Sequence, residues 1–401
     1  MLPIKKIINS LGWRVNLLLK KDWENKLYRF EQSISNKKIS NLRVLIGPSF
    51  AIYPPSYAID KSLTLALKLK GVEIIPIYCD SVQDIECNFI GGDWTKQNSF
   101  EKNCKNCRTT SEKLWRINSE KALRFSSYLS GDDINHITEI VSELSFEEAL
   151  CFNLNGIAYG RMAKDILVNN YLVATPSLID NHNYLLKVHL SNLLRVSLIY
   201  ERILDEKKPD RVVSNDSYYG MWALLEHHCK MRSIPFYSHW PATMNRVAFA
   251  HNDAAMNLDL KASWEKFLKK PLSNENEQKV ERWLVGERGY VIDTTKLGGY
   301  EQSDPILSEV DLDKPTIVLA ANVIWDLAAL DKQIIFNDMI EWIVETIEWF
   351  ASNDNAQLVI KPHPAETAPK IPRTNENVAK ALKARGVIFP KNVFLLKPDT
   401  N

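Results

Sequence analysis

Short apolar runs that end in turn-forming residues recur along this 401-residue sequence, and they constrain its fold more than any other feature. Residues 41–49 (NLRVLIGPS) and 72–78 (VEIIPIY) are runs of this kind, and a helical pattern over residues 59–71 separates them. A strand, a helix and a second strand with short connections predict a parallel βαβ unit. We therefore expect an α/β protein.

A second unit of the same kind follows later in the chain. Residues 210–213 (DRVV) and 234–238 (IPFYS) read as strands, and an apolar stripe from Tyr218 to Cys229 predicts the helix between them. Residues 111–206 are mostly helical in pattern, with interruptions near Asn155-Gly156 and Thr175-Pro176. The first part of the chain is thus predicted to be a Rossmann-like domain with a helical insertion.

Residues 298–314 are polar, rich in turn formers and weakly periodic, which predicts a linker between two domains. Strands are expected beyond it at 316–321, 357–361 and 393–396, with helices near 336–350 and 375–384. A Rossmann-like half normally needs about twice as many elements to cover its sheet. The expected division is residues 1–300 for the N-terminal domain and 315–401 for a partial second domain.

The overall charge and hydropathy exclude two classes of protein. The net charge of +1, from 50 basic and 49 acidic residues, argues against a nucleic-acid-binding protein. The sequence has no run of about 18 apolar residues that could span a membrane. Residues 1–21 mix apolar and basic positions without the layout of a secretory signal, which predicts a cytoplasmic location. That segment fits a helix packed on its own domain or a peripheral helix on the inner face of the membrane.

The clearest candidate site is residues 359–366 (VIKPHPAE), at the carboxyl end of a predicted strand. Open α/β sheets bind ligands at that edge, where Lys361, His363 and Glu366 would converge. Proline on both sides of His363 restricts its backbone and so the placement of the imidazole. An imidazole and an ammonium suit a phosphate that gains charge as a leaving group. The alternative is a rigid turn with an incidental histidine.

Residues 361–366 (KPHPAE) resemble the His-Pro motif of bacterial capsular-polysaccharide glycosyltransferases, including the Kdo transferases of capsule assembly. The same dipeptide occurs in bacterial sialyltransferases and in teichoic-acid polyol-phosphate transferases. Residues 322–326 (NVIWD) and 336–346 are similar to segments that precede the motif in capsule-synthesis proteins, and the resemblance covers about residues 155–396. It implies a GT-B fold and a cytidine-nucleotide donor, with residues 1–300 as the acceptor-side domain and residues 315–401 as the partial nucleotide-sugar-binding domain.

The resemblance also implies roles for individual residues. Lys361, His363, Pro364 and Glu366 would bind the nucleotide of a CMP-linked, Kdo- or sialic-acid-like donor, and His363 would also be catalytic. The acceptor would be a growing capsular glycan or a glycolipid. Two alternatives stay open: a polyol-phosphate transferase with a CDP-linked donor, and an inactive binding or scaffold subunit of the polysaccharide machinery.

The resemblance ends before the sequence pattern of the family is complete. The family continues with a Ser/Thr-rich loop and a Gly-Leu-Glu-type helix start that help to hold the nucleotide. Neither is present by Asn401. The expectation is a C-terminally incomplete enzyme, which leaves the activity of this chain open, and the sequence indicates no oligomeric state.

Glycosyl transfer also needs a base that takes the proton of the acceptor hydroxyl, and a carboxylate usually supplies it. Asp216 follows a predicted strand of the first domain and is the preferred candidate, although it would also serve as a helix cap. Asp326 and Glu366 are rivals at the edge of the second domain. Gly47 and Ser49 either line the acceptor site or form an ordinary turn.

Four of the six cysteines lie within 29 residues: Cys79, Cys87, Cys104 and Cys107. The last two form a C-x-x-C pair, and four thiolates at this spacing could hold a structural zinc ion. An iron–sulfur cluster and four plain thiols are the alternatives. A metal ion here would stabilise a long loop and take no part in catalysis.

Overall fold

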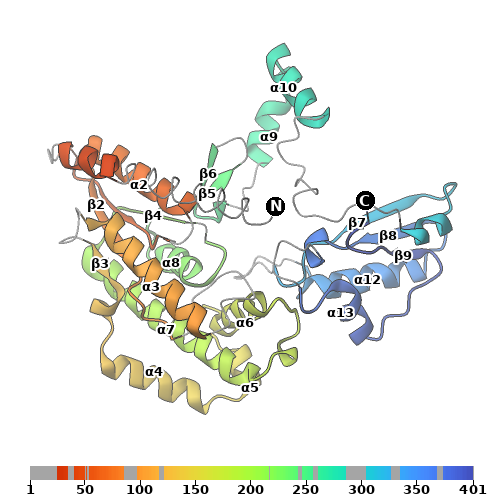
Figure 1. Cartoon of the computed structure of the whole chain (residues 1–401), viewed down its shortest axis with the longest axis horizontal. Helices are drawn as coiled ribbons and strands as arrows, with labels where there is room; N and C mark the ends of the chain where they lie inside the picture. The colour runs from red at the N-terminus through yellow and green to blue at the C-terminus, as the bar shows by residue number, and fades with distance from the viewer. Residues whose placement is uncertain are drawn as a thin grey trace, which may run out of the picture.

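A computed structural model describes residues 25–34, 40–49, 51, 54–84, 97–116, 122–215, 217–242, 246–255, 261–285, 304–326, 335–367 and 374–400 (Figure 1). Within these residues the chain forms one sheet of six strands and a separate sheet of three. Helices pack on both sheets, so the α/β class is confirmed. No helix of the described segments is long and apolar enough to cross a membrane.

The six-stranded sheet has the strand order β3-β2-β1-β4-β5-β6. Its strands are β1 (Arg43–Ile46), β2 (Glu73–Tyr78), β3 (Leu123–Arg124), β4 (Arg211–Asn215), β5 (Phe236–Ala242) and β6 (Arg246–His251). All neighbours run parallel except β6, which is antiparallel to β5. This is the order of a Rossmann fold, in which successive strands are added on one side of β1 up to β3 and on its other side from β4 onward. The carboxyl ends of β1 and β4 therefore form the switch point of the sheet.

Helix α2 (Pro54–Leu69) connects β1 to β2 and ends before Gly71, which adopts a φ of +74°. The left-handed conformation favours glycine there. Helix α8 (Gly220–Met231) connects β4 to β5 in the same way. The buried side chains of β1, Val44 to Ile46, pack on both faces of the sheet, as the apolar runs predict.

The helical insertion consists of α3 (Gln97–Leu114), α4 (Gly131–Glu143), α5 (Phe146–Leu150), α6 (Tyr159–Tyr171) and α7 (His182–Lys207). The helices are interrupted where the sequence predicts: Asn155 and Gly156 have positive φ, and Pro176–Leu178 form a short 3-10 turn. Gly160 lets α6 pack on α5, because a Cβ at that position would lie 2.2 Å from the carbonyl oxygen of Ala149. The insertion is thus confirmed.

The second sheet has the order β7 (Thr316–Ala320), β8 (Gln357–Lys361) and β9 (Val393–Leu395), all parallel. Helices α12 (Met339–Ala351) and α13 (Val378–Ala384) pack on one face, and the 3-10 helix η6 (Pro305–Glu309) packs on the other. Val318 on the edge strand β7 is 64% exposed. With its parallel strands and covering helices, this second sheet makes a second Rossmann-like unit beside the first. The predicted limits at residues 300 and 315 stay a prediction, since residues 286–303 lie outside the described segments.

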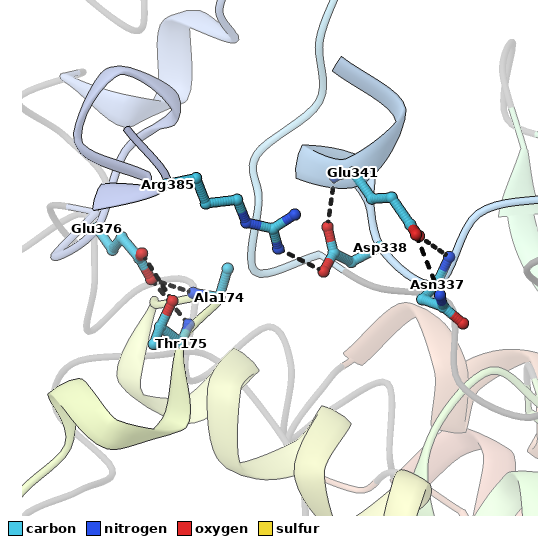
Figure 2. A network of polar contacts seen from close by, with 7 residues as sticks. All are labelled: Ala174, Thr175, Asn337, Asp338, Glu341, Glu376 and Arg385. Atoms are coloured by element: carbon cyan, nitrogen blue, oxygen red, sulfur yellow. Dashed lines mark hydrogen bonds and ion pairs between the residues drawn. The ribbon is translucent and has the colours of Figure 1, made fainter. Parts of the chain in front are cut away.

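The two units contact each other through a buried carboxylate, that of Glu376, which precedes α13 (Figure 2). Its oxygens accept hydrogen bonds from the backbone N–H groups of Ala174 and Thr175, at 2.7 and 2.8 Å, and from the Thr175 hydroxyl at 2.9 Å. Asn375 Nδ2 donates to the carbonyl oxygen of Tyr171, at the end of α6. The segment before α13 is thereby fixed to the helical insertion.

Candidate functional site

Lys361 is the last residue of β8, and its ammonium group connects two loops at the carboxyl edge of the second sheet. Lys361 Nζ donates to the carbonyl oxygen of Pro398 at 2.7 Å and to that of Pro362 at 3.3 Å. Burial lowers the pKa of Lys361, while the negative charges of Asp399 and Glu366 act in the opposite direction. The lysine holds the loop after β9 beside the loop after β8.

The imidazole of His363 is held in one tautomer by a backbone hydrogen bond. The N–H of Ala365 donates to His363 Nδ1 at 3.0 Å, so that nitrogen carries no proton and the neutral ring is protonated at Nε2. Burial lowers the pKa of His363, Asp326 raises it and Lys361 lowers it further. The described part of the chain places no acceptor on Nε2. The result is a neutral, half-buried N–H donor at the end of β8.

Asp326 follows β7 and lies close enough to His363 to affect its pKa. Its Oδ1 accepts a hydrogen bond from the hydroxyl of Tyr219 at 3.1 Å, and its Oδ2 accepts one from Asn322 Nδ2 at 3.3 Å. Tyr219 belongs to the connection between β4 and α8. Burial raises the pKa of its phenol well above the usual value, and Asp326 and then Asp165 raise it further. The carboxyl edges of the two sheets therefore meet beside His363.

A buried carboxylate, Asp165 on α6, belongs to the same region, since its charge acts on the Tyr219 phenol. Burial raises its pKa to about 7, although the nearby charges of Arg161 and Lys164 lower it. Asp165 Oδ2 and Arg161 Nη2 are buried without a hydrogen-bond partner among the described residues. Sequence reasoning missed this pair. The signal was an acid and a base four residues apart on a helix that is otherwise almost entirely buried.

Two of the predicted donor-binding residues have structural contacts in the second unit. Glu366 is 2% exposed, and its Oε1 accepts a hydrogen bond from the N–H of Val378 at the start of α13, at 3.0 Å. Burial raises its pKa to about 7. Pro364 begins a short 3-10 turn, Pro364–Glu366, which the His363 ring caps. Lys361 and His363 are brought together as predicted, whereas Glu366 is directed at α13.

The predicted base, Asp216, lies outside the described residues, and its role stays a prediction. The residue before it, Asn215, is buried at the end of β4 and accepts a hydrogen bond from Ser56 of α2 at 2.7 Å. The switch point between β1 and β4 is thus lined with polar groups. Gly47 adopts a φ of +112°, and a Cβ there would lie 2.5 Å from the carbonyl oxygen of Ile77. Ser49 has a buried hydroxyl without a described partner.

A fully buried histidine–aspartate hydrogen bond lies next to this switch point. His239 Nε2, on β5, donates to Asp60 Oδ1, on α2, at 2.6 Å, and neither side chain is exposed. Asp60 and Ser56 are four residues apart and share the face of α2 that covers β4 and β5. Sequence reasoning did not find this pair, because only the packing of α2 on the sheet brings Asp60 and His239 together.

The cysteine cluster is only partly described. Cys79 follows β2, whereas Cys104 and Cys107 lie on α3, so these last two are held on a helix. Burial raises the pKa of the Cys79 thiol to about 12, and the nearby Cys107 and Cys104 add to the effect. Among the described residues no three His, Cys, Asp or Glu side chains are placed to hold a metal ion. Cys87 lies outside them, and the zinc site stays a prediction.

Comparison with known proteins adds little to this picture. No protein-family model matches the chain, and no curated protein is significantly similar to it. One similar solved structure is a UDP-GlcNAc 2-epimerase from Neisseria meningitidis bound to UDP-GlcNAc. It is 10% identical, with a TM-score of 0.21, over 89% of this chain and 71% of that chain. A TM-score this low supports no inference about the present chain.

Proposed function

We propose that this chain is a bacterial glycosyltransferase of the GT-B type. It transfers a sugar from a CMP-linked donor to a capsular or other surface glycan, or to a glycolipid, at the cytoplasmic face of the membrane. The observation that carries the proposal is the fixed tautomer of His363, which presents an Nε2–H donor at the carboxyl end of β8. The second support is the meeting of two Rossmann-like sheets at the same place through Tyr219 and Asp326.

In the proposed reaction His363 acts on the donor phosphate. The acceptor oxygen forms a bond to the anomeric carbon as the bond from that carbon to the CMP oxygen breaks, and CMP leaves with the electron pair. Negative charge then accumulates on the phosphate. A preorganised N–H donor stabilises this charge more than it stabilises the ground state. Because burial lowers the pKa of His363, the ring is neutral at pH 7 and acts as a hydrogen-bond donor.

The proposed role of Lys361 is to supply positive charge and to hold the phosphate site in shape. Its ammonium is half-buried and bonded to the carbonyl oxygens of Pro362 and Pro398, so it fixes the loops on both sides of the phosphate position. Its charge acts on the phosphate in the ground state and in the transition state alike. Pro364 would hold His363 in place, and Glu366 would support the start of α13 without contacting the donor.

The acceptor proton goes to a carboxylate in this proposal. Asp216 stays the preferred base from the sequence. Among the described carboxylates Asp326 is the best placed, because it is exposed and lies beside both Tyr219 and His363. Glu366 is an unsuitable base, since its carboxyl group is buried on α13. Direct displacement with a base of this kind inverts the anomeric configuration.

Calorimetry tests the proposal against its two rivals. The protein is titrated with CMP and with CDP, and then incubated with CMP- and CDP-linked donors. A CMP-dependent glycosyltransferase binds CMP and releases it from a CMP-sugar. A polyol-phosphate transferase releases CMP from a CDP-polyol instead. A scaffold subunit need bind neither nucleotide, and the absence of binding at millimolar CMP would contradict the proposal.

A further inference from the structure

Helices α9 (Lys261–Leu268) and α10 (Asn274–Val285) form an arm, residues 261–285, that stands out from the rest of the chain (Figure 1). Every described side chain between Lys261 and Glu281 is exposed. Helices of eight and twelve residues gain most of their stability from the burial of an apolar face. No described residue covers that face of the arm, which leaves it open to a surface outside the described segments.

The exposed face of α9 is aromatic and aliphatic. Trp264, Phe267 and Leu268 are each between 62% and 63% exposed, and their spacing places them on one side of the helix. Leu272, in the connection to α10, is 61% exposed and extends the apolar surface beyond the helix. Four large apolar side chains so close together are more than the scattered exposed residues of an ordinary surface.

The charged residues around this face are mostly basic. Residues 261–270 contain four lysines, Lys261, Lys266, Lys269 and Lys270, and one acidic residue, Glu265, which gives a formal charge of +3. Residues 271–281 contain Glu275, Glu277 and Glu281 against Lys279, a formal charge of −2. The positive charge is therefore confined to α9 and the residues that follow it directly.

We propose that α9 and the connection up to Leu272 dock the protein on the surface of an anionic lipid bilayer. An aromatic and leucine face beside a lysine-rich polar face is the composition of helices that lie in the membrane interface. Lysine stems extend along the apolar boundary while the ammonium groups reach anionic head groups. Protein interfaces, by contrast, are depleted in lysine. Helix α10, with its excess of glutamates, stays in solution.

Docking of this kind is independent of the donor chemistry. It would hold the enzyme where a membrane-bound glycolipid acceptor is found, but it requires neither His363 nor a cytidine nucleotide. A failure of the proposed transferase activity would therefore leave the docking surface intact, and the reverse also holds.

Vesicle flotation of the full chain tests the proposal. The vesicles are phosphatidylcholine with one quarter phosphatidylglycerol, and pure phosphatidylcholine for comparison, at 0.1 M and 0.5 M NaCl. The apolar variant is Trp264→Ser with Phe267→Ser, and its matched control is Leu312→Ser, which replaces a leucine 92% exposed in the second unit. The charge variant is Lys269→Glu with Lys270→Glu, matched by Lys383→Glu with Lys391→Glu at two exposed positions of the second unit.

The wild-type protein and both controls are expected to float with the anionic vesicles at low salt and much less with the neutral ones. The apolar variant should lose at least about tenfold in partitioning. The charge variant should lose a similar factor together with most of the salt dependence. Circular dichroism checks that the variants stay folded. If the apolar variant does not fold, the charge variant still tests the proposal.

Any of three results would overturn the docking surface. One is that the wild-type chain does not float with anionic vesicles, and another is that the apolar variant floats as well as its control. The third is that light scattering finds a dimer of the wild-type chain that the apolar variant loses, with no binding to vesicles. In that case the partner of the arm is a second copy of the chain.

Discussion

The hydroxyl of Tyr219 donates a hydrogen bond to Asp326 Oδ1 at 3.1 Å, and this contact joins the carboxyl edges of the two sheets. Tyr219 follows β4 of the first sheet, and Asp326 follows β7 of the second. Asp326 also acts electrostatically on His363, which follows β8. A change at Tyr219 should therefore reach His363 through Asp326, although no described hydrogen bond joins Tyr219 to the histidine.

Replacing Tyr219 by Phe removes the hydroxyl and keeps the ring. We expect turnover to fall by about tenfold or more, because Asp326 is no longer oriented beside His363, while the free energy of unfolding changes by only about 1 kcal/mol. A double-mutant cycle with Asp326→Asn measures whether the two residues act as a pair. Additive losses, or a rate within twofold of wild type, would show that the contact is only structural. Tyr184→Phe, at an exposed tyrosine of α7, is the control.

His363→Ala should lower turnover by about 10²–10³, since the phosphate loses a preorganised donor. The ring also caps a short turn through Ala365, so stability should fall by about 1 kcal/mol. Lys361→Ala should instead raise the Kd of the donor, since the ammonium acts on ground state and transition state alike. Steady-state kinetics with a CMP-sugar, calorimetry and thermal melting separate these effects, with His136→Ala on the exposed side of α4 as control. Unfolding of His363→Ala would make the histidine a structural residue.

Most of the strands and helices could be predicted because their signals are local. The runs at 43–46, 73–78 and 357–361 are apolar and end in turn formers, and the structure places strands there. Helix α3 was missed because its sequence, QNSFEKNCKNCRTTSEKL, is polar and has few apolar positions to show a helical period. Strand β6 was missed because it is an edge strand with mostly exposed side chains, and its pairing with β5 defines it.

The residues of the candidate site also fall into those with a local sequence signal and those defined only by packing. Lys361 and His363 were found because the strand, the prolines and the two side chains lie within a few residues of one another. Tyr219 and Asp165 were not found, since each gains its role only when α6 and the loop after β4 pack beside the second unit. The structural role of Glu366 was also hidden, because the start of α13 that it supports is 12 residues away.

Glu376→Gln should loosen the contact between the two units. Its carboxylate accepts three hydrogen bonds from Ala174 and Thr175, and an amide would keep only one acceptor oxygen for them and remove the negative charge that strengthens them (Figure 2). The free energy of unfolding should fall by about 2–3 kcal/mol, the range for hydrogen bonds to a charged group. Hydrogen exchange at the Ala174 and Thr175 amides should accelerate more than exchange in β1. Glu309→Gln, at an exposed glutamate of η6, is the control, and equal exchange in the two variants would contradict the prediction.

Asp165 should make the stability of the protein depend on pH. Its pKa is about 7 in the folded chain and 3.8 in the unfolded chain. Between these values the folded state binds the proton and the unfolded state does not, so the contribution of Asp165 to stability falls as the pH rises from about 4 to 7 and is level above. Asp165→Asn should remove this slope and stabilise the protein at pH 8 by a few kcal/mol.

Urea unfolding of both proteins at pH 5 and pH 8 measures this difference. The gain of Asp165→Asn over wild type should be full at pH 8 and clearly smaller at pH 5, where the folded carboxyl is protonated but the unfolded one is still mostly ionised. Asp354→Asn, at an exposed position after α12, should show no such difference between the two pH values. The charge of Asp165 also acts on the Tyr219 phenol, so we expect Asp165 to help position the Tyr219–Asp326 contact. Asp165→Asn should then be more stable and less active, and a variant of full activity would confine Asp165 to a structural role.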